Sequence, residues 1–312
     1  MPCLSRVIEE HASAPLRLDR YISEVLSLLS RSQIKARCLK AKINGKEVKL
    51  SRIVKQGDLL EMRWEDSPPV DIIPQDIPLE IVYEDARCIV VNKAQGMVVH
   101  PGAGNRQGTF ANALYFRRLN KGAGEINGSL RPGIVHRLDK ETSGIIIAAY
   151  DDEAHAFLAE QFKAGKTEKK YIAIVHGTPK EMKGRIETFI ARDPKNRKRF
   201  AVSVSGVSRG KNAVTCYKVI KSWQNYSLVL LRPRTGRTHQ LRVHMRYLGY
   251  PILGDSVYGN ADSHFPNTSL MLHSKSLAIV LPDEAEKKVF SSAMPERFTA
   301  VMEKLNRINS HG

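Results

Sequence analysis

The chain has 312 residues, of which 42% are hydrophobic and 26% are charged, values typical of a folded protein in water. Its 49 Lys and Arg against 32 Asp and Glu give a net charge of +17, a balance that favours an anionic partner such as nucleic acid. The four cysteines lie far apart without a C-x-x-C pair, so no disulfide framework or zinc site is predicted. The N-terminus lacks a secretory signal, and no run of about 20 apolar residues is present. We therefore expect a cytoplasmic protein with no membrane association.

Residues 16–65 have the pattern of a small basic module. Apolar residues recur at helical spacing from Leu18 to Leu29, and Ser30 is placed to cap a second helix over Arg31–Leu39. An Asn-Gly turn then separates two short strands within Ile43–Val48. Nine Lys or Arg and a single acidic residue lie between residues 31 and 55. A run of charge is often only a solvated face, but this density favours phosphate contacts, which we predict from Arg31, Lys35, Arg37, Lys42 and Lys46.

A proline-rich stretch follows the module. Residues 67–78 contain four prolines and no helical periodicity, as expected of a stiff linker. We therefore predict a module over residues 1–66 (core 16–65), a linker over 67–78 and a large domain over 79–312. The length of the chain is sufficient for one large and one small domain.

The large domain is rich in short β-type runs. Strands are predicted at Leu79–Tyr83, Cys88–Val91, Met97–Val99, Tyr171–Val175, Ala201–Val204, Val214–Ile220 and Ser227–Leu231, and helices at Ala154–Phe162 and Glu296–Leu305. Strands and helices do not alternate regularly, which indicates an α+β fold with a mixed, mainly antiparallel sheet flanked by helices.

A charged island lies between two runs that suit buried strands. Ile134–Val135 precedes it and Ile145–Ala149 follows it, and both runs are rich in β-branched residues. The ionisable residues between them, from His136 to Glu141, cost energy to bury unless they are paired. The pattern predicts a functional site, in which Asp139 is the first residue to explain.

Three further polar segments lie in the same domain. The glycine-rich residues 99–106 lack the G-K-[ST] ending of a phosphate loop, so no nucleotide cofactor is predicted. Tyr171 begins a strand, and residues 235–244 are dense in side-chain donors. The histidines of this domain match no metal-ligand spacing, so no metal is predicted.

Together these segments resemble the RluA-type family of RNA pseudouridine synthases. The resemblance spans residues 79–281 and is carried by residues 92–102, 133–139, 170–173, 235–244 and 249–259. The front module resembles the S-four-like RNA-binding domain, through residues 17–21, 30–34 and 43–48. This combination is similar to the RluC/RluD branch, whose members act on large-subunit ribosomal RNA.

The resemblance implies a role for individual residues. Asp139 would be the catalytic nucleophile and Arg237 its cationic partner, while Tyr171 would lie against the base and take part in proton removal from carbon-5. Arg137 would help to extrude the uridine or fill its gap. Leu241 would add an apolar wall, and His136 and His239 would face the RNA. The implied reaction needs no cofactor, and the expected partner is structured RNA, either large-subunit ribosomal RNA or its precursor particle, bound by a monomer.

Two alternatives remain open at this point. A base-releasing glycosylase would pair two carboxylates, and Glu141 shares a face with Asp139 if the segment is extended. A non-catalytic RNA-binding ribosome-assembly factor would keep the fold without the chemistry.

Overall fold

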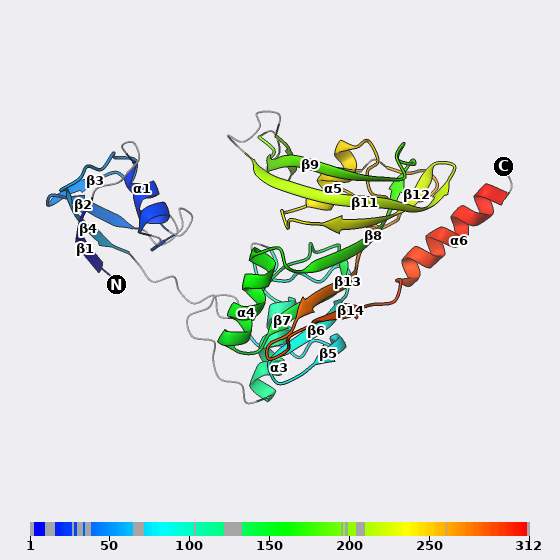
Figure 1. Cartoon of the computed structure of the whole chain (residues 1–312), viewed down its shortest axis with the longest axis horizontal. Helices are drawn as coiled ribbons and strands as arrows, with labels where there is room; N and C mark the ends of the chain where they lie inside the picture. Colours follow the sequence, from blue (N-terminus) through cyan, green and yellow to red (C-terminus); the bar gives the residue numbers. More distant parts are fainter. Residues whose placement is uncertain are drawn as a thin grey trace. The chain divides into compact units, whose positions relative to one another are not determined.

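The computed structural model describes residues 3–9, 16–26, 28–29, 34, 39–64, 72–102, 104–121, 133–194, 196, 199–203, 210–259 and 261–310. The chain forms two compact units, Met1–Asp71 and Ile72–Gly312 (Figure 1). Residues 72–78, which were predicted to be linker, therefore group with the larger unit. The Asn112 side chain donates to the Ile73 carbonyl at 2.8 Å, and the Gln75 N–H donates to the Asn112 carbonyl at 3.2 Å. Within the described part of the chain, no helix has both the length and the apolarity needed to cross a bilayer.

The smaller unit contains a four-stranded antiparallel sheet in the order β1-β4-β2-β3. Its elements are β1 (Cys3–Val7), α1 (Leu18–Arg20), the π-helical turn η1 (Tyr21–Val25), β2 (Lys40–Ile43), β3 (Lys46–Val48) and β4 (Leu59–Arg63). The predicted Asn-Gly turn is confirmed, with Asn44 at φ 51° and Gly45 at φ 76°, as a tight hairpin of this kind requires.

The basic residues predicted to contact phosphate divide into two groups. Lys42 and Lys46 lie exposed on β2 and β3. Arg31, Lys35 and Arg37 lie outside the described residues, as does most of the helix predicted over Arg31–Leu39.

The larger unit is built on one ten-stranded sheet in the order β10-β9-β11-β12-β8-β13-β7-β6-β5, with β14 pairing to β13. Among these pairs only β13 and β7 run parallel, so the prediction of an α+β fold with a mixed, mainly antiparallel sheet is confirmed. The elements are β5 (Glu80–Glu84), β6 (Cys88–Lys93), α3 (Phe110–Asn120), β7 (Ser143–Ala149), α4 (Asp152–Lys163), β8 (Glu168–His176), β9 (Lys183–Arg192), β10 (Phe200–Val202), β11 (Lys211–Trp223), β12 (Tyr226–Pro233), α5 (Gln240–Tyr247), β13 (Leu272–Val280), β14 (Lys287–Ser291) and α6 (Glu296–Ser310).

Some local predictions are wrong. Met97–Val99 forms no strand, and Ile134 makes only an isolated bridge to Ala148. Helix α3 is not predicted by the sequence pattern because its apolar residues form no clean stripe. It begins instead at a capping box, in which the Thr109 hydroxyl accepts from the Asn112 N–H and the Asn112 side chain accepts from the Thr109 N–H.

The arrangement of the sheet determines where the site lies. Figure 1 shows β9, β11 and β12 with α5 on one side of the unit, and β13, β7, β6 and β5 with α3 and α4 on the other. Strand β8 lies between β12 and β13 and so joins the two halves. Every residue of β7 is buried. The loop that leads into β7 therefore ends in the middle of the unit.

Candidate active site

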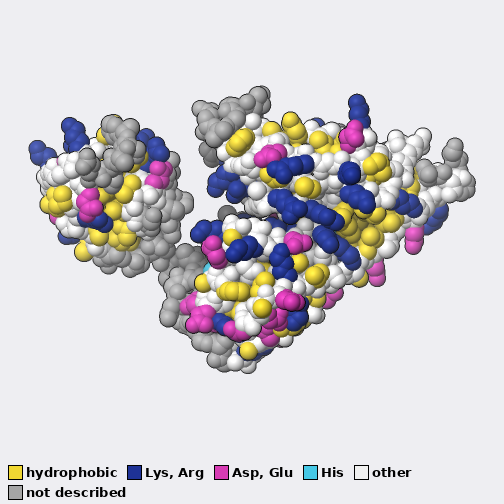
Figure 2. Space-filling view, in the orientation of Figure 1, with side chains coloured by type: hydrophobic (Ala, Val, Ile, Leu, Met, Phe, Trp, Pro, Cys, Tyr) yellow, Lys and Arg dark blue, Asp and Glu magenta, His cyan; other side chains and the backbone are white. Residues whose placement is uncertain are grey.

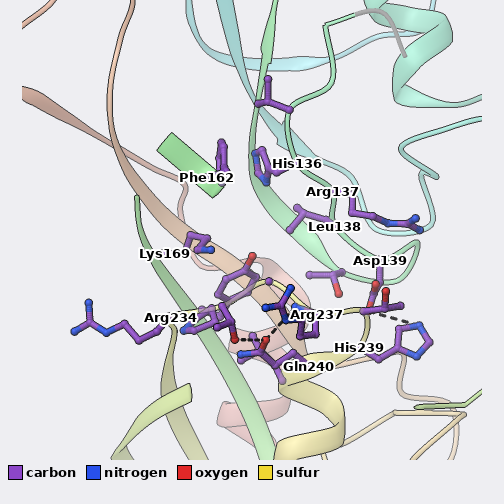
Figure 3. A pocket seen from close by; sticks show the side chains of 18 of the residues that line it. His136, Arg137, Leu138, Asp139, Phe162, Lys169, Arg234, Arg237, His239 and Gln240 are labelled. Carbon is purple, nitrogen blue, oxygen red and sulfur yellow. Dashed lines mark hydrogen bonds and ion pairs between the residues drawn. The ribbon is translucent and has the colours of Figure 1, made fainter. Parts of the chain in front are cut away.

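A cleft of about 600 Å³ lies where the loop before β7 faces the segment that leads into α5. Its described lining comes from the charged island, from Tyr171 on β8, from Phe162 at the end of α4, and from residues 233–242 (Figure 3). The cleft thus brings together residues from all four polar segments noted in the sequence, the glycine-rich one through His100.

Two glycines fix the ends of the loop that carries Asp139. A Cβ on Gly133 would lie 1.9 Å from the Ala149 carbonyl oxygen, and a Cβ on Gly144 would lie 2.2 Å from the Ser274 carbonyl oxygen. Both residues also have positive φ, +69° and +112°, which side-chain-bearing residues rarely adopt. Close backbone approach at both ends therefore holds the loop against the sheet.

The Asp139 carboxylate faces two basic side chains. Its Oδ2 lies 3.5 Å from Nη1 of Arg242 and 3.9 Å from Nε2 of His239, and Figure 3 shows His239 turned toward Asp139. The Asp139 side chain is 19% exposed, so solvent or a substrate in the cleft can reach it.

Arg242 is held in place by a second carboxylate. Its Nε and Nη2 each donate to Asp255 at 2.7 Å in a bidentate pair, the strongest geometry for such a contact. Burial works against the charge of Arg242, but the hydrogen bonds and charge of Asp255, together with the charge of Asp139, raise its pKa above the ordinary value. Burial likewise opposes the charge of Asp255, yet Arg242 and two backbone N–H groups lower its pKa.

The expected pairing of Arg237 with Asp139 is not found. The Arg237 Nε donates to the Asn212 carbonyl at 2.8 Å, and its backbone N–H donates to the Gln240 side chain at 3.0 Å. The physical reason is the turn before α5, where His239 adopts φ 55° and the helix begins at Gln240. This turn directs Arg237 to the rim of the cleft, whereas Arg242, in the first turn of α5, points at the carboxylate.

His239 lies between Tyr258 and Asp139. Its Nδ1 lies 2.8 Å from the Tyr258 hydroxyl while its Nε2 faces Asp139. Burial is the main cause that lowers the pKa of His239, although the charge of Asp139 opposes this shift. The contact of His239 with RNA stays a prediction.

Tyr171 lies in the floor of the cleft and is 8% exposed. Burial raises its pKa to about 12, the Ser274 hydroxyl opposes the shift, and the charge of Asp139 adds to it. The phenol is therefore neutral at physiological pH, and a role as a base requires it to lose a strongly held proton.

The remaining predicted residues occupy distinct places. Leu241 is buried and lines the cleft, while Arg137 is exposed at its mouth. His136 accepts a hydrogen bond from the Ile147 N–H at 3.0 Å and stacks on Phe162 at 4.3 Å, and burial lowers its pKa to about 3. One ring nitrogen of His136 thus ties the island to β7 and is not available to RNA.

A buried polar network supports α5 from beneath. The Gln240 side chain donates to the Val214 carbonyl and to the Thr215 hydroxyl, both at 3.0 Å. His244, which is fully buried, lies 2.9 Å from the Thr215 hydroxyl and 3.0 Å from that of Thr188. These bonds tie the helix to β11 and β9 and so fix the direction of Arg242.

Arg242 and Asp255 were not among the predicted site residues. The signal for Arg242 was present in residues 235–244, which contain two arginines, but their spacing does not reveal which one faces the carboxylate. Within the described residues, no group of three His, Cys, Asp or Glu side chains is placed to hold a metal ion.

Comparisons with known proteins give consistent results. The sequence profile described as RNA pseudouridylate synthase matches residues 87–247. The chain is 46% identical over 289 residues to the ribosomal large subunit pseudouridine synthase D of Borreliella burgdorferi, covering 91% of this chain and 87% of that one. It is 40% identical to the protein of the same name from Zymomonas mobilis, with 90% of each chain covered. The structure is similar to human RNA pseudouridylate synthase domain containing 4, with TM-score 0.59 and 26% identity over 73% of this chain and 93% of that one.

Proposed function

The chain belongs to the RluA-type family of RNA pseudouridine synthases, and we propose that it modifies large-subunit ribosomal RNA with Asp139 as the nucleophile. The observation that carries the assignment of Asp139 is its place in the cleft, where it faces the anchored guanidinium of Arg242 at 3.5 Å. The substrate class follows from the relatives, two of which are named for the ribosomal large subunit.

The reaction replaces the carbon–nitrogen bond between ribose and uracil with a carbon–carbon bond. The bond from the ribose carbon C1′ to uracil N1 breaks, a bond from C1′ to C5 forms, the C5 proton leaves, and N1 gains a proton. The base and the sugar both stay in the product, so no donor, oxidant or water is consumed. A carboxylate can act either on the uracil ring or at the ribose as the bond breaks, and both routes require the group to lie next to an extruded nucleotide.

The cleft is suited to a base that has left its stack. It is large enough for a nucleoside, with apolar Leu241 and the neutral phenol of Tyr171 in its wall. Extruding a base costs a few kcal/mol, and this cost is lowest in a loop or bulge. Proteins also recognise individual bases most often in single-stranded or looped RNA. Structured RNA with an exposed uridine is the substrate that this geometry favours.

We further propose that the smaller unit is an S-four-like RNA-binding domain. Its exposed Lys42 and Lys46 support phosphate contacts. The larger unit offers a second basic area, since Figure 2 shows Lys and Arg side chains gathered over β8, β11 and β12. The exposed basic residues there include Lys170, Lys218 and Arg232. RNA bound to either area would release counterions, and its affinity would fall with salt.

The test is to incubate the purified protein with a large-subunit ribosomal RNA transcript and to map pseudouridine by position. Pseudouridine at a small number of fixed positions is the expected result. Free uracil in the supernatant would instead support a base-releasing glycosylase. RNA binding without either product would support an assembly factor.

A further inference from the structure

Lys169 lies in the same cleft as Asp139 but on the side of Phe162. It is two residues before Tyr171 on β8, the spacing that places two side chains on one face of a strand, and both residues line the cleft. Figure 3 shows Lys169 between Phe162 and the Arg237 segment. Its neighbour Lys170 is exposed on the opposite face of β8.

The Lys169 ammonium has no acceptor among the described residues. Its Nζ lies 5.8 Å from the centroid of the Phe162 ring. Lys93, a fully buried lysine of this unit, shows how a structural ammonium is bound here. Lys93 donates to the carbonyl oxygens of Ala94 and Met97 at 2.8 Å and to that of Lys140 at 3.2 Å.

Lys169 is only part-buried, but a cation that loses part of its hydration is still costly unless a partner replaces the lost water. Burial lowers the pKa of Lys169, which records the same cost. An apolar side chain would fill the space beside Phe162 with no such penalty, so packing alone does not account for a lysine at this position. An anion that enters the cleft with the substrate would supply the missing partner.

We propose that Lys169 binds a phosphate of the RNA backbone next to the extruded uridine, an inference that rests on the proposed function. Residues two apart on a strand are separated by about 6 to 7 Å, which is similar to the distance between a base and its own phosphate. A uracil against Tyr171 would therefore place its phosphate close to Lys169.

The charge of the cleft agrees with this assignment. The Lys and Arg side chains among the described lining residues are Arg137, Lys163, Lys169, Arg234, Arg237 and Arg242, and Asp139 is the one carboxylate there. Lys163 is paired with Glu160 at 3.4 Å and is largely exposed, and Arg234 is exposed. Lys169 is half-buried and lies on the side of the cleft away from Asp139. It is thus the cation best placed to contact a phosphate that has lost part of its hydration.

The experiment compares Lys169→Met, which keeps the length of the side chain, with Lys169→Arg and with Lys288→Met, at an exposed lysine on β14, as a control. The probe is a large-subunit ribosomal RNA transcript that carries tritium at carbon-5 of uridine, because isomerisation releases this tritium. For Lys169→Met we expect KM to rise about tenfold while kcat changes less than about threefold, the pattern of a lost binding contact. The slope of log affinity against log salt should decrease in magnitude by about 0.7. Lys169→Arg should restore KM, and Lys288→Met should leave it unchanged.

Two outcomes overturn the inference. In one, kcat falls while KM stays constant, which would place Lys169 in the chemistry. In the other, KM and the salt slope are the same as in the wild type. Folding is checked by denaturant unfolding, where Lys169→Met should be at least as stable as the wild type because it removes a part-buried charge that has no hydrogen-bond acceptor among the described residues. Failure of the proposed function is distinguishable, because the wild-type protein would then release no tritium from any RNA while the salt slopes could still be compared.

Discussion

Nη1 of Arg242 lies 3.5 Å from Oδ2 of Asp139, a distance at the upper limit for a hydrogen bond. Because its other donors are committed to Asp255 at 2.7 Å, Arg242 does not move freely toward Asp139. The guanidinium therefore provides a fixed positive charge beside a carboxylate that keeps most of its hydrogen-bonding capacity for substrate. Preorganised charge of this kind is a large contributor to catalysis in other enzymes.

The roles of Arg242 and Arg237 can be separated by substitution. Arg242→Met should lower kcat by about 10²- to 10³-fold, as loss of a preorganised charge does elsewhere. It should also lower the free energy of unfolding by about 3 to 5 kcal/mol, because Asp255 is left buried and unpaired. Arg237→Met should change kcat far less, since its guanidinium bonds a backbone carbonyl. Single-turnover kinetics and denaturant unfolding measure the two effects.

The double variant Arg242→Met/Asp255→Asn separates stability from catalysis. It should recover part of the stability because the unpaired carboxylate is removed, yet remain slow. Recovery of the rate together with stability would show that Arg242 acts only through folding.

Asp139→Asn should lower the rate of tritium release by about 10⁴-fold or more, which is the effect of losing the nucleophile in other enzymes. RNA affinity should change little. Glu141→Gln is the matched control, an amide substitution two residues away, and should keep its activity. If Asp139→Asn still forms pseudouridine at the wild-type rate, Asp139 is not the nucleophile.

Tyr171→Phe tests whether the phenol takes part in proton removal. A pKa of about 12 means that little phenolate exists at neutral pH, so a basic role depends on proton loss during the reaction. If Tyr171 has that role, the variant should react about 10²- to 10⁴-fold more slowly, and uridine deuterated at carbon-5 should give a larger isotope effect than in the wild type. Near-normal rates would limit Tyr171 to packing against the base.

Stability should fall in mild acid because of two histidines that are completely buried. Burial lowers the pKa of His244 and of His273 to about 4, whereas both would titrate near 6.5 in the unfolded chain. Between pH 6.5 and 4 the unfolded chain binds protons that the folded chain does not, so stability decreases as the pH falls. The two groups together contribute up to about 2.7 kcal/mol per pH unit.

Denaturant unfolding at pH 7 and pH 5 measures this effect. His244→Gln should flatten the pH dependence, and the same change at exposed His264 serves as the control. Equal unfolding midpoints at the two pH values would contradict the prediction.

Removal of residues 1–71 tests the smaller unit. The larger unit has its own core and should still isomerise RNA, but with weaker binding and a shallower dependence on salt, because phosphate contacts are lost. A combined Lys42→Ala/Lys46→Ala variant in the full chain should change the slope in the same direction. An unchanged slope in both would show that this unit adds no electrostatic affinity.

The sequence was sufficient to predict the kind of sheet, most strands and the charged island around Asp139, because β-branched runs and isolated charges are local signals. It was not sufficient to identify the cation that faces Asp139. That choice depends on the left-handed backbone at His239 and on the start of α5 at Gln240, and a positive φ is uncommon for any residue other than glycine. The sequence also did not reveal that residues 72–78 group with the larger unit, because proline content indicates stiffness but not the contacts of these residues with α3.

The two glycines at the ends of the Asp139 loop determine which molecule must change shape during the reaction. Because the backbone is closely packed at Gly133 and Gly144, we expect both ends of the loop to stay on the sheet and to keep its carboxylate inside the cleft. The RNA must therefore supply the movement, and the ease with which a uridine leaves its helix should set the order in which sites are modified. Unfolded or loop uridines would then react before paired ones of the same sequence, so the choice of target would be made largely by the fold of the RNA.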